Sequence, residues 1–401
     1  MSKTQPFFSL LRNANIIGPD ELGYQDILIA GTKIAAIGKD LVLPQVYDSQ
    51  EIDLTGHTIL PGFIDSHVHM IGGGGEGGYA TKTPEIILSK VTTSGVTTLV
   101  GCLGTDGTTR HMESLLAKAR GLEEEGLSTY IYTGAYEIPT PTITGSIRKD
   151  IIIIDKIIGV GEIAMSDHRS AQPTKSEYQK LAAESRVGGM LSGKAGIVNM
   201  HLGDGTDGMK LLYEITANGE LPKSQFLPTH VNRNAKLLDE SIEWAKQGGL
   251  MDITSGVSPA SGSAKAIKPS AAVKKALTAG VPLTQITMSS DGNGSMPIFD
   301  EKGSTIGVGV ANQSSMLEEV RDMVQNEGIS ISNAIQIVTS NVAKALKLWP
   351  EKGTIAIGSD ADIVVINKDF NLTNVWAKGQ HMVKDSKVIA WGTFEAKETE
   401  F

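Results

Sequence analysis

Two hydrophobic patterns alternate along the middle of the chain. Short apolar runs predict β-strands over 97–103, 129–136, 161–165, 196–201, 226–230, 250–254 and 283–289. Longer helix-like stretches between most of them predict helices over 84–93, 112–125, 176–191, 236–248, 269–279 and 313–327. Such alternation is typical of a parallel sheet covered by helices. About eight strand–helix units favour a (β/α)8 TIM barrel, and a doubly wound open sheet is the alternative fold.

The two ends of the chain have a different pattern of short strands and turns. Residues 26–30 and 33–38, separated by Gly31 and Thr32, predict a β-hairpin, and 361–366 and 375–379 predict further strands. Neither end has enough strands for a stable core. Because chain termini often lie close in space, we expect both ends to form one small β-sandwich. The predicted division is 1–60 and 348–401 for this small β-domain and 61–347 for the barrel.

Composition restricts the class of protein. The chain has 401 residues, of which 40% are hydrophobic and 20% charged, as in ordinary globular enzymes. A net charge of −9 argues against nucleic acid or an anionic membrane as a partner. Cys102 is the only cysteine, which excludes an internal disulfide and fits a reducing compartment. The first residues, 1–5, do not lead into a signal-peptide core, so we expect a cytoplasmic protein.

A His-x-His pair follows the apolar stretch 58–63. In an extended strand, side chains at positions i and i+2 point to the same face, so His67 and His69 can bind one metal ion while Val68 packs behind them. Imidazole is a common ligand of zinc and related metals. A bare His-x-His pair is equally compatible with one buried and one solvated histidine, so the interpretation depends on the rest of the chain.

Four more candidate ligands lie on or just after predicted strands. His201, His230 and Asp291 follow apolar runs, and Glu162 lies within one, where a carboxylate is unfavourable unless a cation pairs with it. Each residue alone is more often structural than ligating. Together they lie where a barrel places its chemistry, at the C-terminal ends of the strands. The pattern therefore indicates a metal site.

Several longer motifs make the assignment more specific. The chain resembles the amidohydrolase superfamily and, within it, the isoaspartyl (β-aspartyl) dipeptidases, almost from end to end. The entry motif Pro-Gly-Phe-Ile-Asp-x-His-x-His at 61–69 marks the superfamily. The resemblance continues through 104–106, 133–136 and 289–295, and the motifs at 72–76, 166–169 and 230–234, within 228–234, are much narrower.

The resemblance implies a fold, a metal centre and an assembly. The fold would be a (β/α)8 barrel with a small β-domain from both termini, and the protein would be a homo-oligomer such as an octamer. Two zinc ions would share a bridging hydroxide, one held by His67 and His69 and the other by His201 and His230. Asp291 would complete the ligands of the first metal and carry protons during catalysis.

One position departs from the family pattern. The family normally bridges its metals with a carboxylated lysine, and the matching position here is Glu162. A glutamate brings the bridging carboxylate without capturing carbon dioxide, but its shorter side chain requires the strand to lie closer to the metals. We therefore predict a two-metal site bridged by Glu162 and indifferent to bicarbonate. The alternative is that Glu162 is a surface carboxylate and the site holds one metal.

The remaining polar motif residues suit a small, charged dipeptide. Glu76, on the glycine-rich loop, would pair with the substrate α-ammonium group, and Arg169 and Arg233 would bind its carboxylates bidentately. Tyr136 would donate its hydroxyl to the oxyanion of the tetrahedral intermediate. Weaker hydrogen-bonding roles fall to the Gly74 backbone, Thr105 and Ser295. The alternatives without a functional role are that the arginines form surface salt bridges and that Tyr136 is a strand residue packed in the wall of the barrel.

Three functions compete on the sequence alone. The favoured one is a metallo-dipeptidase that cleaves β-aspartyl bonds. A cyclic-amide hydrolase or N-acyl amino-acid deacylase of the same superfamily would leave Glu76 without a purpose, and a non-catalytic scaffold would not need all six candidate ligands. The Gly-x-Gly-x-x-Gly pattern at 72–77 matches a dinucleotide fingerprint, but residues 86–105 contain no acidic residue to hold a ribose. We therefore reject nucleotide binding.

Overall fold

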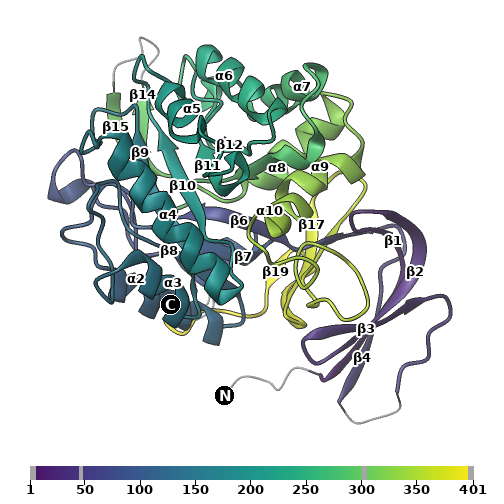
Figure 1. The fold of residues 1–401 in the computed structure, drawn as a ribbon. Helices are drawn as coiled ribbons and strands as arrows, with labels where there is room; N and C mark the ends of the chain where they lie inside the picture. The colour runs from purple at the N-terminus through teal and green to yellow at the C-terminus, as the bar shows by residue number, and fades with distance from the viewer. Residues whose placement is uncertain (1–5, 45–47, 300–304, 396–401) are drawn as a thin grey trace.

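The computed structural model of the chain describes residues 6–44, 48–299 and 305–395. Residues 1–5, on which the signal-peptide expectation depends, lie outside these ranges. Eight parallel strands form the middle of the chain (Figure 1). They are β6 (Phe63–Val68), β7 (Val96–Gly101), β8 (Ser128–Thr133), β9 (Ile157–Met165), β10 (Ile197–Leu202), β11 (Phe226–Thr229), β12 (Met251–Thr254) and β13 (Ile286–Ser289).

Backbone hydrogen bonds connect these strands in sequence order. Strands β6 to β11 form one sheet, and β12 pairs with β13 in a second. The amide of Val231, just after β11, donates to the carbonyl of Asp252 in β12 at 3.3 Å. The amide of His69, just after β6, donates to the carbonyl of Gly292 beyond β13 at 2.9 Å. Because the last strand thus returns to the first, the arrangement is of the TIM-barrel type rather than an open sheet.

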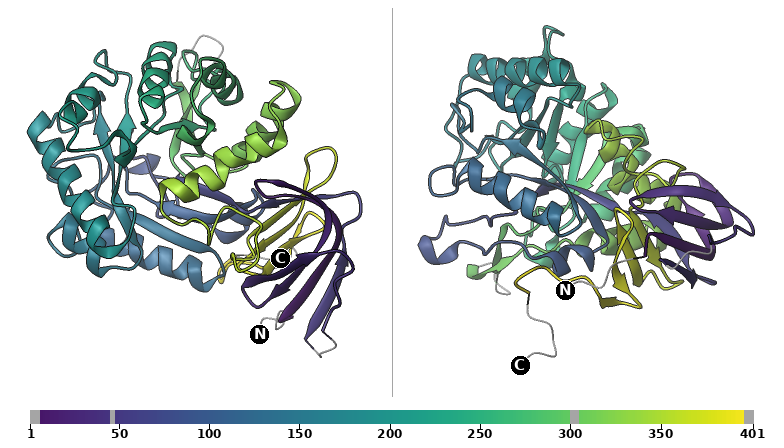
Figure 2. Two further views of the ribbon diagram at one scale, coloured as in Figure 1. Left: turned by 45° about the vertical axis from the view of Figure 1, so that its right-hand side comes forward. Right: turned by 90° about the horizontal axis from the view of Figure 1, so that it is seen from below.

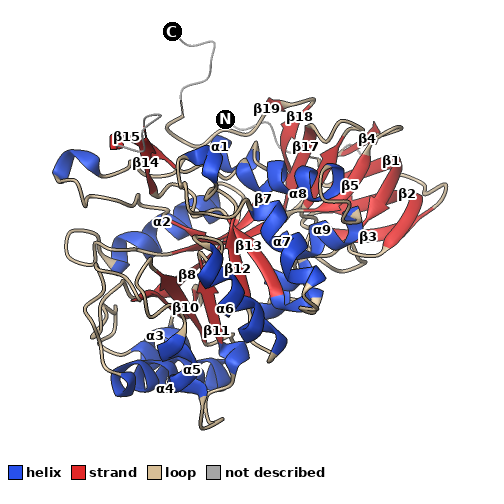
Figure 3. Ribbon diagram, turned by 90° about the horizontal axis from the view of Figure 1, so that it is seen from above, coloured by secondary structure: helices blue, strands red, loops and turns tan. Residues whose placement is uncertain are grey.

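Helices lie outside the parallel strands (Figure 3). They are α1 (Leu88–Thr92), α2 (Met112–Glu124), α3 (Ile147–Ile153), α4 (Lys175–Ser192), α5 (Lys210–Thr216), α6 (Ala235–Lys246), α7 (Pro269–Thr278), α8 (Ser315–Gln325), α9 (Ile331–Val338) and α10 (Ser340–Ala345). Short 3-10 turns occupy Tyr79–Thr81, Lys223–Gln225, Pro259–Ser261 and Leu283–Gln285. None of the helices in the described ranges is both long and apolar enough to cross a membrane.

Helix α4 shows how the sequence determines the helix ends. Thr174 accepts a hydrogen bond from the amide of Glu177, whose side chain reaches back to Thr174, and this reciprocal capping box starts the helix. Gly193 ends it in the left-handed conformation at φ 73°. The six predicted helices are present, whereas α3, α5, α9 and α10 were not predicted. Helix α3 contains most of the apolar run at 151–154.

Both ends of the chain contribute to one nine-stranded mixed sheet, in which the purple and yellow strands lie side by side (Figure 2). Its order is β19-β18-β17-β16-β5-β1-β2-β3, with β4 paired to β1. The strands are β1 (Phe8–Ile17), β2 (Glu21–Ala30), β3 (Lys33–Gly38), β4 (Ser49–Asp53), β5 (Thr58–Pro61), β16 (Ile363–Ile366), β17 (Leu372–Ala377), β18 (Gln380–Lys384) and β19 (Lys387–Val388). The predicted union of both termini in one β-structure is therefore present. Its division into two packed layers, and the domain boundaries at 60 and 347, stay predictions.

The chain passes from the mixed sheet to the barrel at Gly62. A Cβ atom there would lie 2.2 Å from the Thr97 hydroxyl oxygen, so only glycine fits between the two sheets. A buried ion-pair cluster lies nearby, where the Lys352 ammonium group lies 2.6 Å from Asp360 and 2.7 Å from Asp362. Lys352 also contacts the hydroxyl of Ser128 in β8, which connects this cluster to the barrel.

One unpredicted hairpin lies beside the mouth of the barrel. Strands β14 (Ser295–Phe299) and β15 (Thr305–Val310) pair antiparallel shortly after Asp291. The amide of Asn293 donates to the carbonyl of Ala311 at 2.9 Å, which fixes the base of the hairpin. The hairpin therefore begins at the edge where the candidate ligands gather.

Candidate active site

The six candidate ligands predicted from sequence come together at the C-terminal edge of the strands. His67 and His201 lie on β6 and β10, Glu162 lies on β9, and His69, His230 and Asp291 follow β6, β11 and β13. The four histidines are at most 7% exposed and Glu162 is 1% exposed. The interpretation of Glu162 as a surface carboxylate is therefore wrong.

One oxygen of Glu162 faces the first histidine pair. Glu162 Oε2 lies 3.3 Å from His67 Nε2 and 4.0 Å from His69 Nε2. Asp291 Oδ1 lies 3.1 Å from His69 Nε2 and 3.5 Å from His67 Nε2. Two imidazole nitrogens and two carboxylates thus converge on one small volume, which is a donor set suited to a divalent metal.

The other oxygen of Glu162 faces the second histidine pair. Glu162 Oε1 lies 2.5 Å from His201 Nδ1 and 3.3 Å from His230 Nε2. His230 Nε2 and His201 Nδ1 lie 3.0 Å apart. A single carboxylate therefore stands between two histidine pairs and offers one oxygen to each.

Unpartnered polar atoms show that the site fits metal ions. Both ring nitrogens of His67 and Oε2 of Glu162 are buried and have no hydrogen-bond partner among the described residues. Burying such groups without a partner is costly, and a metal ion would satisfy them. The described residues contain two groups whose possible ligand atoms all lie within 4.8 Å of one another. The first group is His67, His69, Cys102 and Glu162. The second group is Glu162, His201 and His230.

The electrostatics of the site favour deprotonated ligands at two positions. Burial, together with the charges of His201 and Arg233, lowers the pKa of His230 to about 3, so this imidazole stays neutral and able to bind a metal. Burial would raise the pKa of Glu162, but the nearby imidazoles of His67 and His201 hold it well below its ordinary value.

The backbone at two ligand positions adopts the left-handed conformation, which is uncommon outside glycine. His230 has φ 64° and Asp291 has φ 55°. The segment that carries Asp291 is anchored to β6, because the Ser290 amide donates to Asp65 Oδ1 at 3.0 Å and Asn293 Nδ2 donates to the His69 carbonyl at 2.9 Å. Unfavourable backbone of this kind persists where the surroundings determine it, commonly at functional sites.

A polar cluster borders the second histidine pair. The hydroxyl of Tyr136 lies 2.8 Å from His201 Nδ1. Arg169 donates to Glu76 Oε1 at 3.0 Å, and Thr105 donates to the same oxygen at 2.8 Å. The structure thus brings Tyr136, Glu76, Arg169 and Thr105 together, as their motifs predicted.

Three other predicted residues occupy the same region. A Cβ atom on Gly74 would lie 2.6 Å from the Ser295 Cβ atom, so the glycine loop and the start of β14 are in close contact. The amide of Arg233 donates to the His230 carbonyl at 3.0 Å, one turn after the ligand. The buried Nε of Arg233 has no hydrogen-bond partner among the described residues.

Sequence reasoning missed three residues that contact the candidate ligands from behind. Asp167 Oδ2 lies 3.0 Å from His201 Nε2, Thr254 Oγ1 lies 2.7 Å from His230 Nδ1, and Cys102 Sγ lies 3.8 Å from His69 Nδ1. Asp167 belongs to the quoted motif at 166–169, which was the available signal. Cys102 is the only cysteine of the chain, which was a signal of its own, whereas nothing in the sequence pattern distinguishes Thr254 from other strand-end residues.

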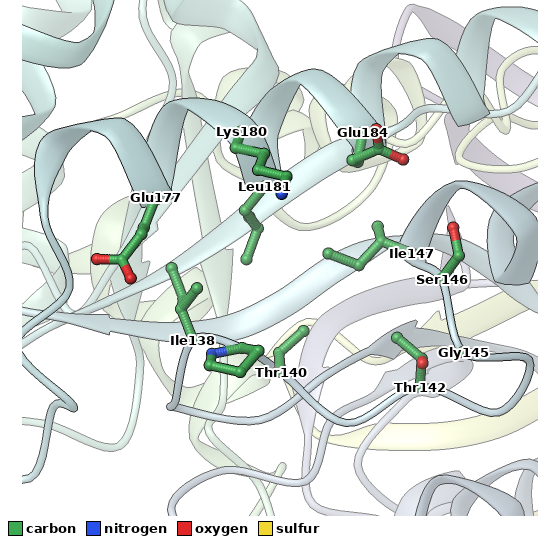
Figure 4. A pocket seen from close by; sticks show the side chains of 11 residues that line it. Ile138, Thr140, Thr142, Gly145, Ser146, Ile147, Glu177, Lys180, Leu181 and Glu184 are labelled. Carbon is green, nitrogen blue, oxygen red and sulfur yellow. The ribbon is translucent and has the colours of Figure 1, made fainter.

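A separate cavity lies between α4 and the loop that follows Tyr136 (Figure 4). Its volume is about 390 Å³, and Ile138, Ile147 and Leu181 contribute apolar walls. Glu177, Lys180 and Glu184 project from α4 above it. The six candidate ligands are not among the residues that line this cavity, so it is distinct from the metal site.

Comparison with known proteins identifies the family. The sequence profile of the amidohydrolase family matches residues 58–382. The chain belongs to the amidohydrolase family. Among known proteins, the chain is 24% identical to the dihydroorotase of Aquifex aeolicus, over 95% of this chain and 98% of that protein. It is 20% identical to the L-hydantoinase of Paenarthrobacter aurescens, over 91% of this chain and 86% of that protein.

A solved structure is considerably more similar. The β-aspartyl dipeptidase of Fervidobacterium islandicum AW-1, in complex with the β-Asp-Leu dipeptide, is 42% identical with a TM-score of 0.86. The alignment covers 95% of this chain and 98% of that chain. The dihydropyrimidinase of Brevibacillus agri, at 18% identity and a TM-score of 0.66, shares the fold. This amidohydrolase is therefore a metal-dependent hydrolase that acts on amide bonds, as its motifs predicted.

Proposed function

We propose that this amidohydrolase is a metallo-dipeptidase that hydrolyses the β-aspartyl (isoaspartyl) peptide bond of small dipeptides. The proposal rests on two features that lie together in one site. Glu162 stands between two histidine pairs, and the Glu76–Arg169 ion pair lies beside the pair His201 and His230. The first supports hydrolysis of an amide, and the second supports a substrate that carries both an ammonium group and carboxylates. The similarity to a β-aspartyl dipeptidase supports the same substrate class.

We propose that the site binds two divalent ions, for which Zn²⁺ suits the nitrogen and oxygen donors. His67, His69 and Asp291 would hold one ion, His201 and His230 the other, and Glu162 would bridge them. Bound ions supply an activated water and polarise the scissile carbonyl group. Because Glu162 is itself a carboxylate, metal loading should not depend on bicarbonate. Metal analysis should find two ions per chain, equal with and without bicarbonate, and one ion per chain would contradict the bridge.

Asp291 would move the proton that amide hydrolysis requires. Its carboxylate lies 3.1 Å from His69 at the ligand cluster, and its side chain is 26% exposed, unlike the buried Glu162. It would accept a proton from the attacking water and deliver it to the departing amine, which leaves poorly unless protonated. The Tyr136 hydroxyl, beside His201, would donate a hydrogen bond to the oxyanion of the tetrahedral intermediate.

The contacts of Arg169 and Arg233 support different binding roles for the two side chains. Arg169 donates to both oxygens of Asp167, at 2.9 and 2.8 Å, and also to Glu76. Its guanidinium is therefore engaged by the carboxylates of Asp167 and Glu76, and Arg169 would orient Glu76 toward a substrate ammonium group. The buried Nε of Arg233 has no hydrogen-bond partner among the described residues, so Arg233 is the better partner for a substrate carboxylate.

A dipeptide panel with metal content measured on the same sample tests the function. Each β-linked substrate, such as β-Asp-Leu, is paired with its α-linked isomer, and hydantoin and an N-acetyl amino acid are included. We expect rapid hydrolysis of the β-linked dipeptides alone. Equal hydrolysis of both linkages would remove the proposed specificity, and faster hydrolysis of hydantoin would indicate a cyclic-amide hydrolase.

A further inference from the structure

The second histidine pair has strong hydrogen-bonding partners behind its rings. His201 directs Nδ1 to Glu162, and its other nitrogen lies 3.0 Å from the carboxylate of Asp167. His230 directs Nε2 to Glu162, and its other nitrogen lies 2.7 Å from the hydroxyl of Thr254. Both rings therefore have an oxygen atom behind them at hydrogen-bonding distance, and the His201 nitrogen also lies 3.1 Å from a nitrogen of Arg169.

The first histidine pair has weaker partners. His69 directs Nε2 to Asp291, and its other nitrogen faces Cys102 Sγ at 3.8 Å. The thiol of Cys102 lies 3.7 Å from the Val68 carbonyl, which places its hydrogen on that oxygen and leaves the sulfur, a weak acceptor, toward His69. His67 is fully buried, and both of its ring nitrogens lack a hydrogen-bond partner among the described residues.

The partner behind a metal-bound histidine affects how well the metal is held. Such a partner fixes the ring orientation and the tautomer and raises the basicity of the ligating nitrogen, and its loss typically costs about 10–100-fold in metal affinity. A carboxylate does this more strongly than a neutral group, because a hydrogen bond to a charged acceptor is roughly twice as strong. The two histidine pairs of this chain therefore differ in the quality of their support.

We propose that the two metal subsites have unequal affinities, with the His201–His230 subsite the tighter, and that Cys102 is a positioning residue that supports the His67–His69 subsite only weakly. This inference rests on the proposed two-metal function. Asp291 adds a carboxylate to the first subsite and opposes the difference. The contribution of the residues behind the histidine rings is therefore tested by replacing those residues, because such substitutions leave every proposed metal ligand in place.

The test is a metal titration of the full-length, metal-free protein without substrate. Co²⁺ is added against a competing chelator, and the absorption spectrum follows the filling of each subsite. The unsubstituted protein should fill in two steps. Thr254→Val removes the hydroxyl behind His230 with little change of shape and should weaken the tighter step about tenfold or more. Asp167→Asn is a second variant that should weaken the same step.

Substitutions at Cys102 should change the metal affinity of the weaker titration step, which belongs to the His67–His69 subsite. Cys102→Asp places a carboxylate within reach of His69 Nδ1 and should strengthen the weaker step about tenfold. Cys102→Ala removes the sulfur and should weaken that step by a smaller factor, which keeps the test decisive should the buried aspartate prevent folding. In each case the tighter step should stay unchanged.

Three outcomes would overturn the inference. The first is a single titration step in the unsubstituted protein. The second is a Cys102 variant that shifts the same step as Thr254→Val, or neither step. The third is a thiolate-to-cobalt charge-transfer band that Cys102→Ala abolishes, because it would make the sulfur a ligand rather than an outer partner. Failure to cleave β-Asp-Leu by protein that fills in two unequal steps would instead refute the proposed substrate alone.

Discussion

Two buried charge clusters of this molecule use their charges in opposite ways. Between the barrel and the mixed sheet, Lys352 is 3% exposed and pairs with Asp360 and Asp362 at 2.6 and 2.7 Å. At the mouth of the barrel, Glu162 and His67 are equally buried, yet one carboxylate oxygen and both ring nitrogens have no hydrogen-bond partner among the described residues. The first cluster is complete within the protein, whereas the second requires a ligand.

The difference indicates which cluster serves stability and which serves chemistry. Removing one member of a complete buried pair leaves an uncompensated charge and is strongly destabilising. Removing a group from an incomplete site relieves an unfavourable burial or leaves stability unchanged, and the cost falls on activity. Substitutions in the two clusters should therefore separate stability from turnover.

The largest expected effect is on turnover, at Asp291. Asp291→Asn keeps the shape of the side chain but cannot accept and deliver a proton, so kcat for β-Asp-Leu should fall about 10²–10⁴-fold. The thermal midpoint of the metal-free protein should change little, because the Asp291 side chain is 26% exposed. Steady-state kinetics of the metal-loaded protein and calorimetry of the metal-free protein check both, with metal content measured as the control. A kcat within a factor of ten of the unsubstituted value would exclude Asp291 as the proton carrier.

The complementary change is at Lys352. Lys352→Ala leaves Asp360 and Asp362 buried beside each other, and the free energy of unfolding should fall by about 3–5 kcal/mol. Lys33→Ala is the matched control, because Lys33 also contacts Asp360, at 2.7 Å, but its side chain is 41% exposed. Because Lys33 is exposed although Asp360 is buried, this ion pair should contribute at most about 1 kcal/mol. Chemical denaturation measures both, and equal losses would show that burial does not distinguish the two lysines.

The mixed sheet should also respond to pH through His381. Burial, with a contribution from Lys384, lowers the pKa of His381 to about 4, and its ring stacks on Trp376 with centroids 4.0 Å apart. The unfolded chain takes up this proton near pH 6.5 and the folded protein only near pH 4. The free energy of unfolding should therefore fall as the pH drops across that interval, by about 3 kcal/mol.

The variant His381→Gln isolates this contribution from that of the carboxylates. Denaturation curves at several pH values between 4 and 8 are compared for the two proteins. Between pH 6.5 and 4, the difference between their unfolding free energies should change with the slope expected for the uptake of one proton. Above pH 7 the difference should be constant. Parallel curves across the whole range would assign the acid sensitivity to other groups.

The sequence predicted the cluster of candidate ligands more completely than the surrounding structure, for a physical reason. His67 and His69 share a face because strand side chains alternate, and a barrel collects the ends of its strands at one mouth. Those rules are local or belong to the fold, so they can be read from one chain. The motif residues Glu76 and Arg169 were also predicted, although their direct contact was not.

Contacts between distant segments could not be predicted in this way. Asp167 supports His201 and Cys102 faces His69 because neighbouring strands have a particular register, which no periodicity reveals. The run at 151–154 contains four isoleucines, and β-branched residues favour strands, yet most of it lies in helix α3 packed against α4. Tertiary packing decided that element rather than intrinsic propensity.

The smallest expected effect lies at the rim of the site, where Glu76 is 34% exposed and pairs with Arg169 at 3.0 Å. Its position between the solvent and the ligands predicts a role in binding rather than in stability or chemistry. Glu76→Gln removes the charge that would meet the substrate ammonium group, and KM for β-Asp-Leu should rise about tenfold, since a hydrogen bond to a charged group contributes about 1.5–3 kcal/mol.

Succinyl-leucine is the matched substrate, because it differs from β-Asp-Leu by the absence of the α-amino group. If Glu76 contacts that group, Glu76→Gln should leave the kcat/KM for succinyl-leucine within about twofold, whereas that for β-Asp-Leu falls. Stability should change by less than about 1 kcal/mol, since the Glu76–Arg169 pair is partly exposed. Equal losses for both substrates would mean that Glu76 acts on the shape of the site through Arg169 and not on the ammonium group.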